Sequence, residues 1–438
     1  MQFKRALQHT IAWKSLNTVL AFCINLLLVR IFGAAESGDF FYALTLLAFV
    51  TLVASWSLES GITYHGSNDP ENIPAITIFL LPFLILQGFI IWWLLNNIAI
   101  DLDPRFSWLF ILTNLIITYV SALFYARKWV FAVNIIACVS NAFVLVLLLI
   151  NYFKVFDFAQ VDNGSDVAGN PSLWAGDRHR GAMIIYFAGF VLQALMLVIV
   201  LLSRLRLRWA VVQWDPALMK KIFVYSSIAF ASNLLFFLVT RIDYYFVQRL
   251  CDEVALSNYV QVSKIGQVLV LLPTMMAAVV FPYSSGGDQE NYLEKLQLLC
   301  RGITMLFIPI VIIAAACGFW AFPWLFGDSF QQMYVASLWY LPGFYCLSLI
   351  ILLTSYLLGK SMLKADLLAS LVALVIVVGC DLLWIPTWGI NGAAAASSTA
   401  YFSCLCVLLL IFKNKFGAGP GNFFLPTRSD FSRFRNLE

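Results

Sequence analysis

The sequence predicts an all-α integral membrane protein with twelve transmembrane helices in two pseudo-symmetric lobes of six. Hydrophobic residues make up 62% of the 438-residue chain and charged residues only 11%, and the mean hydropathy is +0.87. Soluble domains contain about 25% charged residues. A pattern also repeats: residues 13–59 can be laid over part of the segment 222–283 with an offset of 218, which places Phe41 on Tyr259. Because this offset is close to half the chain, we expect a duplicated bundle whose halves meet at these two segments.

Each predicted span is a window of roughly 20 apolar residues, which is enough for a helix to cross a hydrocarbon core of about 30 Å. The windows are 13–32, 40–58, 74–95, 106–125, 130–153, 182–202, 222–247, 259–283, 303–322, 334–358, 367–388 and 392–412. We therefore expect an N-terminal lobe over 1–203, a basic linker over 204–221, a C-terminal lobe over 222–413 and a tail over 414–438.

The distribution of positive charge predicts the orientation. With the N-terminus inside, 18 of the 27 Lys and Arg residues fall on the cytoplasmic side and 6 on the outer side. The excess of positive charge on cytoplasmic loops then places both termini in the cytoplasm. The linker alternates arginines with apolar residues, so we expect it to lie on anionic lipid headgroups.

The sequence lacks the motifs of several other functions. The three histidines are far apart, so neither a metal site nor a catalytic triad is indicated, and no Walker A motif is present for direct use of ATP. The nine cysteines are mostly in apolar runs, which argues against a disulfide framework. No loop is long enough for an enzyme domain, the longest being 154–180. We expect a transporter without a cofactor, driven by an ion or substrate gradient, and no nucleic-acid partner.

Three cations within the spans are candidates for binding an anionic substrate. A charge near the centre of a bilayer costs about 2.5 to 3.5 kcal/mol on insertion scales. Arg241 and Lys264 lie on antiparallel neighbours, and with Lys14 they could line a cavity that receives an anionic headgroup. Alternatively, Arg241 pairs with Asp243 or with an acid on another helix, while Lys264 and Lys14 extend to the membrane surface.

Five acids lie within the spans: Asp39, Glu59, Asp243, Asp366 and Asp381. A carboxyl group withdrawn from water could couple the movement of H+ or Na+ to transport. Asp39 and Asp366 are placed where they could cap helices, and Asp381 is close to the outer end of its span. Glu59 and Asp243 are therefore the ion-coupling candidates.

Several motifs together resemble a known family. They are Val29-Arg30-Ile31-Phe32-Gly33, Ser37-Gly38-Asp39-Phe40-Phe41-Tyr42-Ala43, Asp243-Tyr244-Tyr245, Tyr259 with Lys264-Ile265, Phe281-Pro282 and Gly389-Ile390-Asn391-Gly392-Ala393-Ala394. In this order they resemble the Wzx-type polysaccharide biosynthesis flippases, such as the O-antigen flippases. These flippases belong to the multidrug/oligosaccharidyl-lipid/polysaccharide (MOP) exporter superfamily.

The resemblance implies a MATE-like fold, with a central cavity lined mainly by the first two spans of each lobe. In that family the substrate is an undecaprenyl-pyrophosphate-linked oligosaccharide, moved to the outer leaflet of the bacterial inner membrane by alternating access. Arg30, Asp243, Tyr259 and Lys264 fall on family-like motifs, so we expect Arg30 to join the cationic site and Tyr259 to line the cavity. Partners would be the lipid-linked glycan, membrane lipids and, by association, a glycan polymerase and a chain-length regulator. A monomer is the simplest state.

Two other functions stay open. The first is a multidrug exporter of the same superfamily, whose organic-cation substrate would favour net acid in the cavity rather than Arg241 and Lys264. The second is a membrane glycosyltransferase or polymerase, which usually needs a sizeable outer loop for catalysis. Lipid II flippases have spans beyond twelve, which this sequence does not show.

Overall fold

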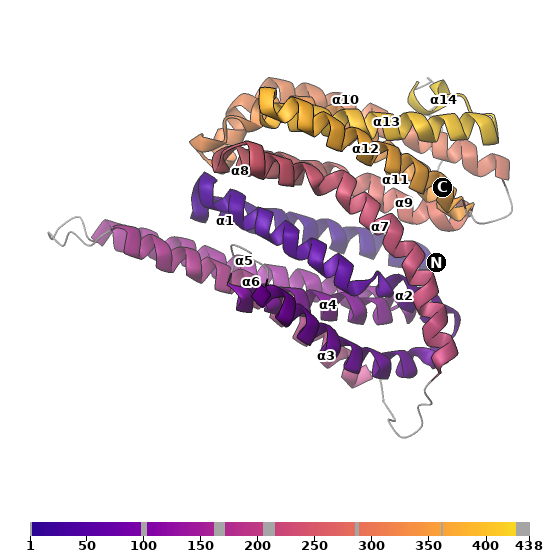
Figure 1. The fold of residues 1–438 in the computed structure, drawn as a ribbon, viewed down its shortest axis with the longest axis horizontal. Helices are drawn as coiled ribbons and strands as arrows, with labels where there is room; N and C mark the ends of the chain where they lie inside the picture. The colour runs from indigo at the N-terminus through magenta and orange to yellow at the C-terminus, as the bar shows by residue number, and fades with distance from the viewer. Residues whose placement is uncertain are drawn as a thin grey trace. The chain divides into compact units, whose positions relative to one another are not determined.

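The computed structural model describes residues 2–97, 103–161, 171–204, 215–284, 289–360 and 362–425, and every regular element within them is a helix (Figure 1). The long helices are α1 (Gln2–Ser55), α3 (Ile73–Asn97), α4 (Pro104–Ala126), α5 (Val130–Val161), α6 (Pro171–Arg204), α7 (Pro216–Leu250), α10 (Gln289–Phe326), α11 (Met333–Gly359), α12 (Leu363–Trp388) and α13 (Ile390–Phe416). Shorter helices are α2 (Leu58–Asn68), α8 (Glu253–Leu269), α9 (Leu271–Ser284) and α14 (Gly421–Phe424), with 3-10 turns η1 (Pro70–Asn72) and η4 (Asp328–Phe330).

The predicted all-α membrane fold is confirmed. In the described residues, 10 helices are long and apolar enough to cross a membrane, or up to 11 when α8 and α9 form one bent span. Helix α1 carries both the first and the second predicted span, so each of the twelve windows falls on a helix to within a few residues.

The chain forms two compact units, residues 1–234 and 235–438, here called unit 1 and unit 2. The boundary between them falls inside α7. The predicted lobes, with their linker and tail, stay a prediction, because residues 205–214 and 426–438 lie outside the described part of the chain. The described end of the tail packs on unit 2: Phe423 is buried, and Nη1 of Arg301 donates a hydrogen bond to the Asn422 carbonyl over 2.9 Å.

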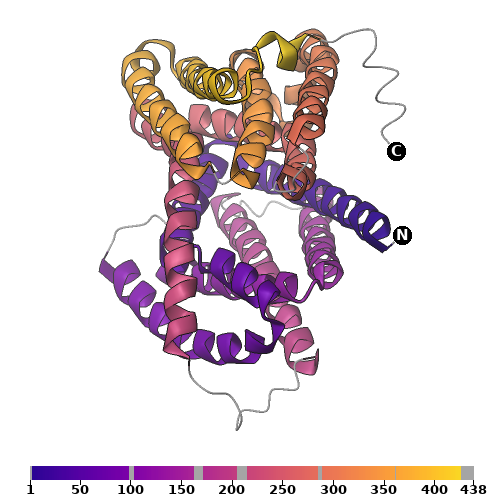
Figure 2. The ribbon, with the colours of Figure 1, turned by 90° about the vertical axis from the view of Figure 1, so that its right-hand side faces the viewer.

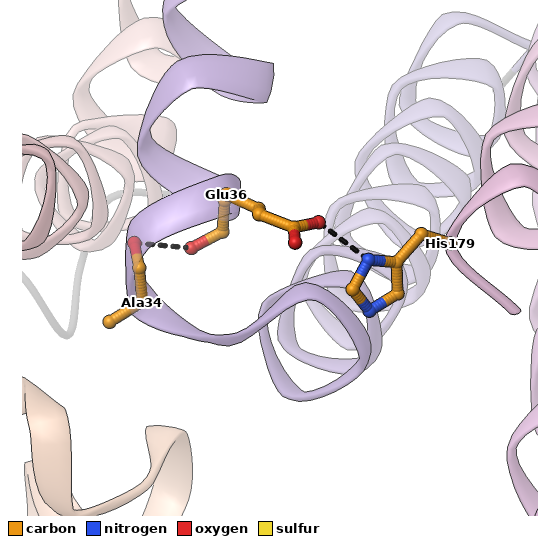
Figure 3. Close-up of polar contacts among 4 residues, drawn as sticks. Ala34, Glu36 and His179 are labelled. Carbon is orange, nitrogen blue, oxygen red and sulfur yellow. Dashed lines mark hydrogen bonds and ion pairs between the residues drawn. The ribbon is translucent and has the colours of Figure 1, made fainter. Parts of the chain in front are cut away.

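Helix α1 is broken at Gly33, whose φ of 74° and ψ of −179° are readily adopted only by glycine. The break is packed against α6 of unit 1. His179 Nδ1 lies 2.5 Å from Glu36 Oε2, and the Ser37 hydroxyl donates to the Ala34 carbonyl over 3.2 Å (Figure 3). The break therefore divides α1 into two arms, as expected for two spans joined by a short turn.

A second break follows at Trp56 and Ser57, which separate α1 from α2 and both have a positive φ, 50° and 49°. Two carbonyls at the end of α1 are left without intrahelical partners, and other spans satisfy them. Nε2 of Gln87 donates to the Ala54 carbonyl over 2.6 Å, and the Tyr119 hydroxyl donates to the Ser55 carbonyl over 3.4 Å. Such repair is needed because lipid offers the backbone no hydrogen bonds.

Close packing in unit 2 is centred on α13, which lies against both α11 and α12 (Figures 1 and 2). Gly392, Ala396 and Ala400 are buried on α13 at four-residue spacing. A Cβ at Gly392 would lie only 2.4 Å from the Trp384 carbonyl oxygen of α12. Small residues thus let these helix backbones approach closely, which is a common basis of helix association in lipid.

We expect Gly392→Ala to destabilise the protein by about 1 to 3 kcal/mol, because the added methyl group would push against backbone rather than a side chain that could move. Gly379→Ala on α12 is the matched control, since its Cβ would meet nothing within 4 Å. The measurement is the melting temperature of each purified variant in detergent. Equal melting temperatures would contradict the close contact.

Candidate functional site

The candidate site in unit 2 is organised by the carboxyl group of Asp243, which has 0% exposure. This carboxyl accepts hydrogen bonds from the Tyr259 hydroxyl of α8 and, over 2.9 Å, from the Ser397 hydroxyl of α13. Its other oxygen accepts the backbone N–H of Tyr244 over 2.9 Å. The carboxyl group therefore connects α7 to two other helices, and these donors offset its removal from water.

Arg241 lies about half a turn before Asp243 on α7 and is half-buried. Its Nη1 donates to the Tyr244 hydroxyl over 2.6 Å and to the Ser263 hydroxyl over 2.9 Å. The guanidinium carbon also lies 5.1 Å from the centre of the Tyr244 ring, within the range of a cation–π contact. In the described residues Arg241 and Asp243 form no ion pair, in keeping with their two-residue spacing.

Aromatic side chains enclose this polar group. The ring of Tyr259 stacks on Tyr340 with centroids 5.8 Å apart, and Tyr340 stacks on Phe344 at 4.1 Å. Tyr401 completes the stack at 6.4 Å from Tyr340. Tyr259 is 0% exposed, so the residue expected to line a cavity lies inside the packed interior of unit 2.

A second carboxyl group, Asp381 of α12, is also 0% exposed. Neither of its oxygens has a hydrogen-bond partner among the described residues. Asp243 and Asp381 are thus two fully buried carboxyl groups of the same unit. An uncompensated buried charge costs several kcal/mol. The carboxyl group of Asp381 would therefore be costly to ionise where it lies.

The remaining predicted residues lie in unit 1. Glu59 is half-buried at the start of α2, and its Oε2 atom is buried without a hydrogen-bond partner among the described residues. Lys14 and Arg30 are exposed on α1. No group of three or more His, Cys, Asp or Glu side chains in the described part of the chain could hold a metal ion.

Sequence reasoning missed Ser397, Tyr340 and Tyr401 as members of the site. Ser397 stands in the small-residue run of the last span, where a hydroxyl group is easily interpreted as packing. It contacts Asp243 across 154 residues of sequence. Asp381 was noted as an intramembrane acid, but its position at the end of a span gave no sign that its carboxyl group is fully buried.

The chain is similar in sequence or structure to several known proteins. Residues 182–335 match a family model described as a polysaccharide biosynthesis protein. The structure is similar to an inward-facing multidrug resistance MATE family transporter of the MOP superfamily, with a TM-score of 0.73 at 13% identity, over 90% of this chain and 94% of that one. The chain carries the MOP transporter fold.

Two other solved structures agree with this fold. Lipid II flippase MurJ, in an inward closed conformation, gives a TM-score of 0.66 at 11% identity, over 94% of this chain and 88% of that one. A MOP superfamily transporter from Pyrococcus furiosus gives 0.65 at 12% identity, over 95% and 96%. No curated protein matches the sequence. The resemblance to this superfamily that the motifs indicated is thus confirmed at the level of the fold, together with a multi-pass membrane protein.

We expect Ser397→Ala to lower stability by about 1 to 3 kcal/mol, because the buried Asp243 carboxyl would lose a donor. Ser403→Ala on the same helix is the control: its hydroxyl donates only to the Thr399 carbonyl, so we expect a change within about 0.5 kcal/mol. Melting temperatures in detergent compare the two variants. A larger loss for Ser403→Ala would contradict the proposed importance of the Asp243 contacts.

Proposed function

We propose that the protein is a flippase that moves an undecaprenyl-pyrophosphate-linked oligosaccharide from the cytoplasmic to the periplasmic leaflet of a bacterial inner membrane. The observation that carries the proposal is the pair of cations, Arg241 and Lys264, held on membrane-spanning helices of unit 2. A pyrophosphate is an anion that such cations would bind, and Arg241 directs its guanidinium to neutral hydroxyls rather than to a carboxylate. Lys14 and Arg30 of unit 1 are proposed to contribute further positive charge.

The comparisons support the substrate class without fixing the glycan. The matched family model is one of polysaccharide biosynthesis, and a lipid II flippase shares the fold. The multidrug exporter stays the alternative, since MATE transporters share the fold equally well and unit 2 also contains Asp243 and Asp381. The Pyrococcus furiosus transporter is described as having a binding pocket of reverse polarity. The charge of the binding pocket therefore differs between proteins of this fold.

The test of the function is to delete the gene in the native host and quantify the undecaprenyl-linked oligosaccharides by mass spectrometry. We expect a complete but unpolymerised repeat unit to accumulate while the surface glycan is lost. An unchanged lipid pool with greater sensitivity to cationic dyes would instead support the exporter.

Complementation of that deletion tests the two cations. We expect Arg241→Gln and Lys264→Gln to restore less than about a tenth of the surface glycan, since a charge-assisted hydrogen bond to phosphate contributes about 1.5 to 3 kcal/mol. Arg249→Gln is the control, because this arginine is exposed on the same helix with its guanidinium 5.4 Å from the Tyr245 ring. Full complementation by both site variants, at equal expression, would show that the cations do not bind substrate.

Coupling to an ion gradient is proposed for Asp243 and Glu59, with no further cofactor. Asp243→Asn keeps the size of the side chain but removes its ability to cycle between charged and neutral forms. In proteoliposomes containing the lipid-linked substrate, we expect this variant to lose the acceleration that a proton or sodium gradient gives the wild type. Glu59→Gln is compared in the same assay, and an unchanged response in both variants would remove these acids as coupling groups.

A further inference from the structure

A hollow of about 480 Å³ lies at one end of unit 1, away from the breaks of α1 described above. Its walls come from the end of α2, the η1 turn and the end of α4, and its lining residues are Ser67, Glu71, Ala126, Arg127 and Lys128. Gly66 allows the close approach of the two helices, because a Cβ there would lie 2.9 Å from that of Ala126. Close packing of α2 and α4 therefore forms one side of this open hollow.

The two cations of this hollow outnumber its one acid. In the described residues neither Arg127 nor Lys128 forms an ion pair, although Glu71 lines the same hollow. The Nε atom of Arg127 is buried and has no hydrogen-bond partner among the described residues. An unsatisfied buried donor on a guanidinium is costly, so a small shift of the Arg127 side chain toward an acceptor in the hollow would be favourable.

A third cation adds to the positive charge. The guanidinium carbons of Arg127 and Arg204 lie 5.5 Å and 5.3 Å from the ring centre of Trp129. Trp129 thus holds two arginines near the same end of unit 1. Positive charge gathered in this way favours an anion with several acceptor oxygens, and the planar arginine fork matches phosphate geometry.

The backbone of Lys128 has a conformation that costs free energy for any residue other than glycine. Helix α4 ends with the N–H of Trp129 donating to the Phe124 carbonyl over 2.8 Å and the N–H of Lys128 donating to the Tyr125 carbonyl over 2.9 Å. This pattern usually has glycine at the position with positive φ. Here that position is Lys128, with a φ of 60°. Strained residues of this kind are concentrated at functional sites.

We infer that this hollow binds the phosphate group of a lipid, with Arg127 and Lys128 as its ligands. By the distribution of positive charge, this end of unit 1 faces the cytoplasm, where a lipid-linked substrate would be loaded. The phosphate site is inferred from Arg127, Lys128 and Arg204 alone. Its assignment to the carrier pyrophosphate, rather than to an anionic membrane lipid, rests on the proposed flippase function.

The first test titrates inorganic pyrophosphate into the full-length protein in neutral detergent, at constant ionic strength, by microscale thermophoresis. We expect Arg127→Gln and Lys128→Gly each to weaken binding by about tenfold or more. Lys128→Gly should keep or raise the melting temperature, because glycine adopts a positive φ without strain. If Lys128 had only a structural role, its replacement would not weaken pyrophosphate binding while keeping or raising the melting temperature.

Lys360→Gly is the matched control. Lys360 also follows the end of a helix and lies 5.9 Å from an aromatic ring, that of Tyr356, but its φ is −87°. We expect it to bind pyrophosphate within about twofold of the wild type. The inference is overturned if the wild type binds neither pyrophosphate nor phosphatidylglycerol, or if both site variants bind pyrophosphate as the wild type does. It is also overturned if Lys360→Gly weakens pyrophosphate binding as much as the site variants do.

Native mass spectrometry with added phosphatidylglycerol distinguishes the two sources of phosphate. Lipid retained by the wild type and lost in both site variants would identify a membrane-lipid headgroup as an occupant. Pyrophosphate binding without lipid retention would identify the carrier. Both results support the phosphate site. The flippase proposal is tested by the lipid pool of the deletion host, which does not depend on these binding measurements, so either proposal can be contradicted without the other.

Discussion

The structure of unit 2 depends on the carboxyl group of Asp243 being held by hydroxyl donors from other helices. An acid on α7 without exposure would be strongly destabilising if it were unpartnered. Tyr259 and Ser397 prevent this, and in doing so they fix how α8 and α13 lie against α7. The stacked tyrosines around them then follow, because each ring buries a large apolar surface while its hydroxyl can remain close to the polar group.

The helix breaks of unit 1 illustrate the same constraint applied to the backbone. Lipid cannot satisfy a free carbonyl, so each interruption of a span needs partners nearby. At Ser55 the partners come from Tyr119 on α4, and at Ala54 from Gln87 on α3. Polar residues in otherwise apolar spans therefore have two different roles here. Gln87 and Tyr119 satisfy free backbone carbonyls, whereas Arg241 and Asp243 place ionisable groups in the interior of a continuous helix.

Much of the fold could be predicted from the sequence, because hydropathy alone locates apolar helices and a charge inside a span is conspicuous. The first turn was expected from the gap between the windows 13–32 and 40–58, and the break lies in that gap at Gly33, where glycine readily adopts the positive φ. The break at Trp56 and Ser57 carried no such signal, because neither residue prefers that conformation. The partners of Asp243 could not be predicted either: they lie on helices distant in sequence, and only packing brings them to α7.

The mixture of charges in unit 2 bears on how transport of an anion could be driven. Arg241 and Lys264 are basic residues of unit 2, cationic when protonated, and two buried carboxyl groups, those of Asp243 and Asp381, lie in the same unit. An anionic substrate would compete with the carboxylates for the field of these cations. Neutralising a carboxylate, by a proton or a small cation, would strengthen the hold on the anion, and releasing that ion would weaken it. A ligand shifts a conformational equilibrium only through such a difference in affinity between two states. The buried acids are then compatible with an anionic substrate, because under the proposed function they would supply the difference in affinity that coupled transport requires.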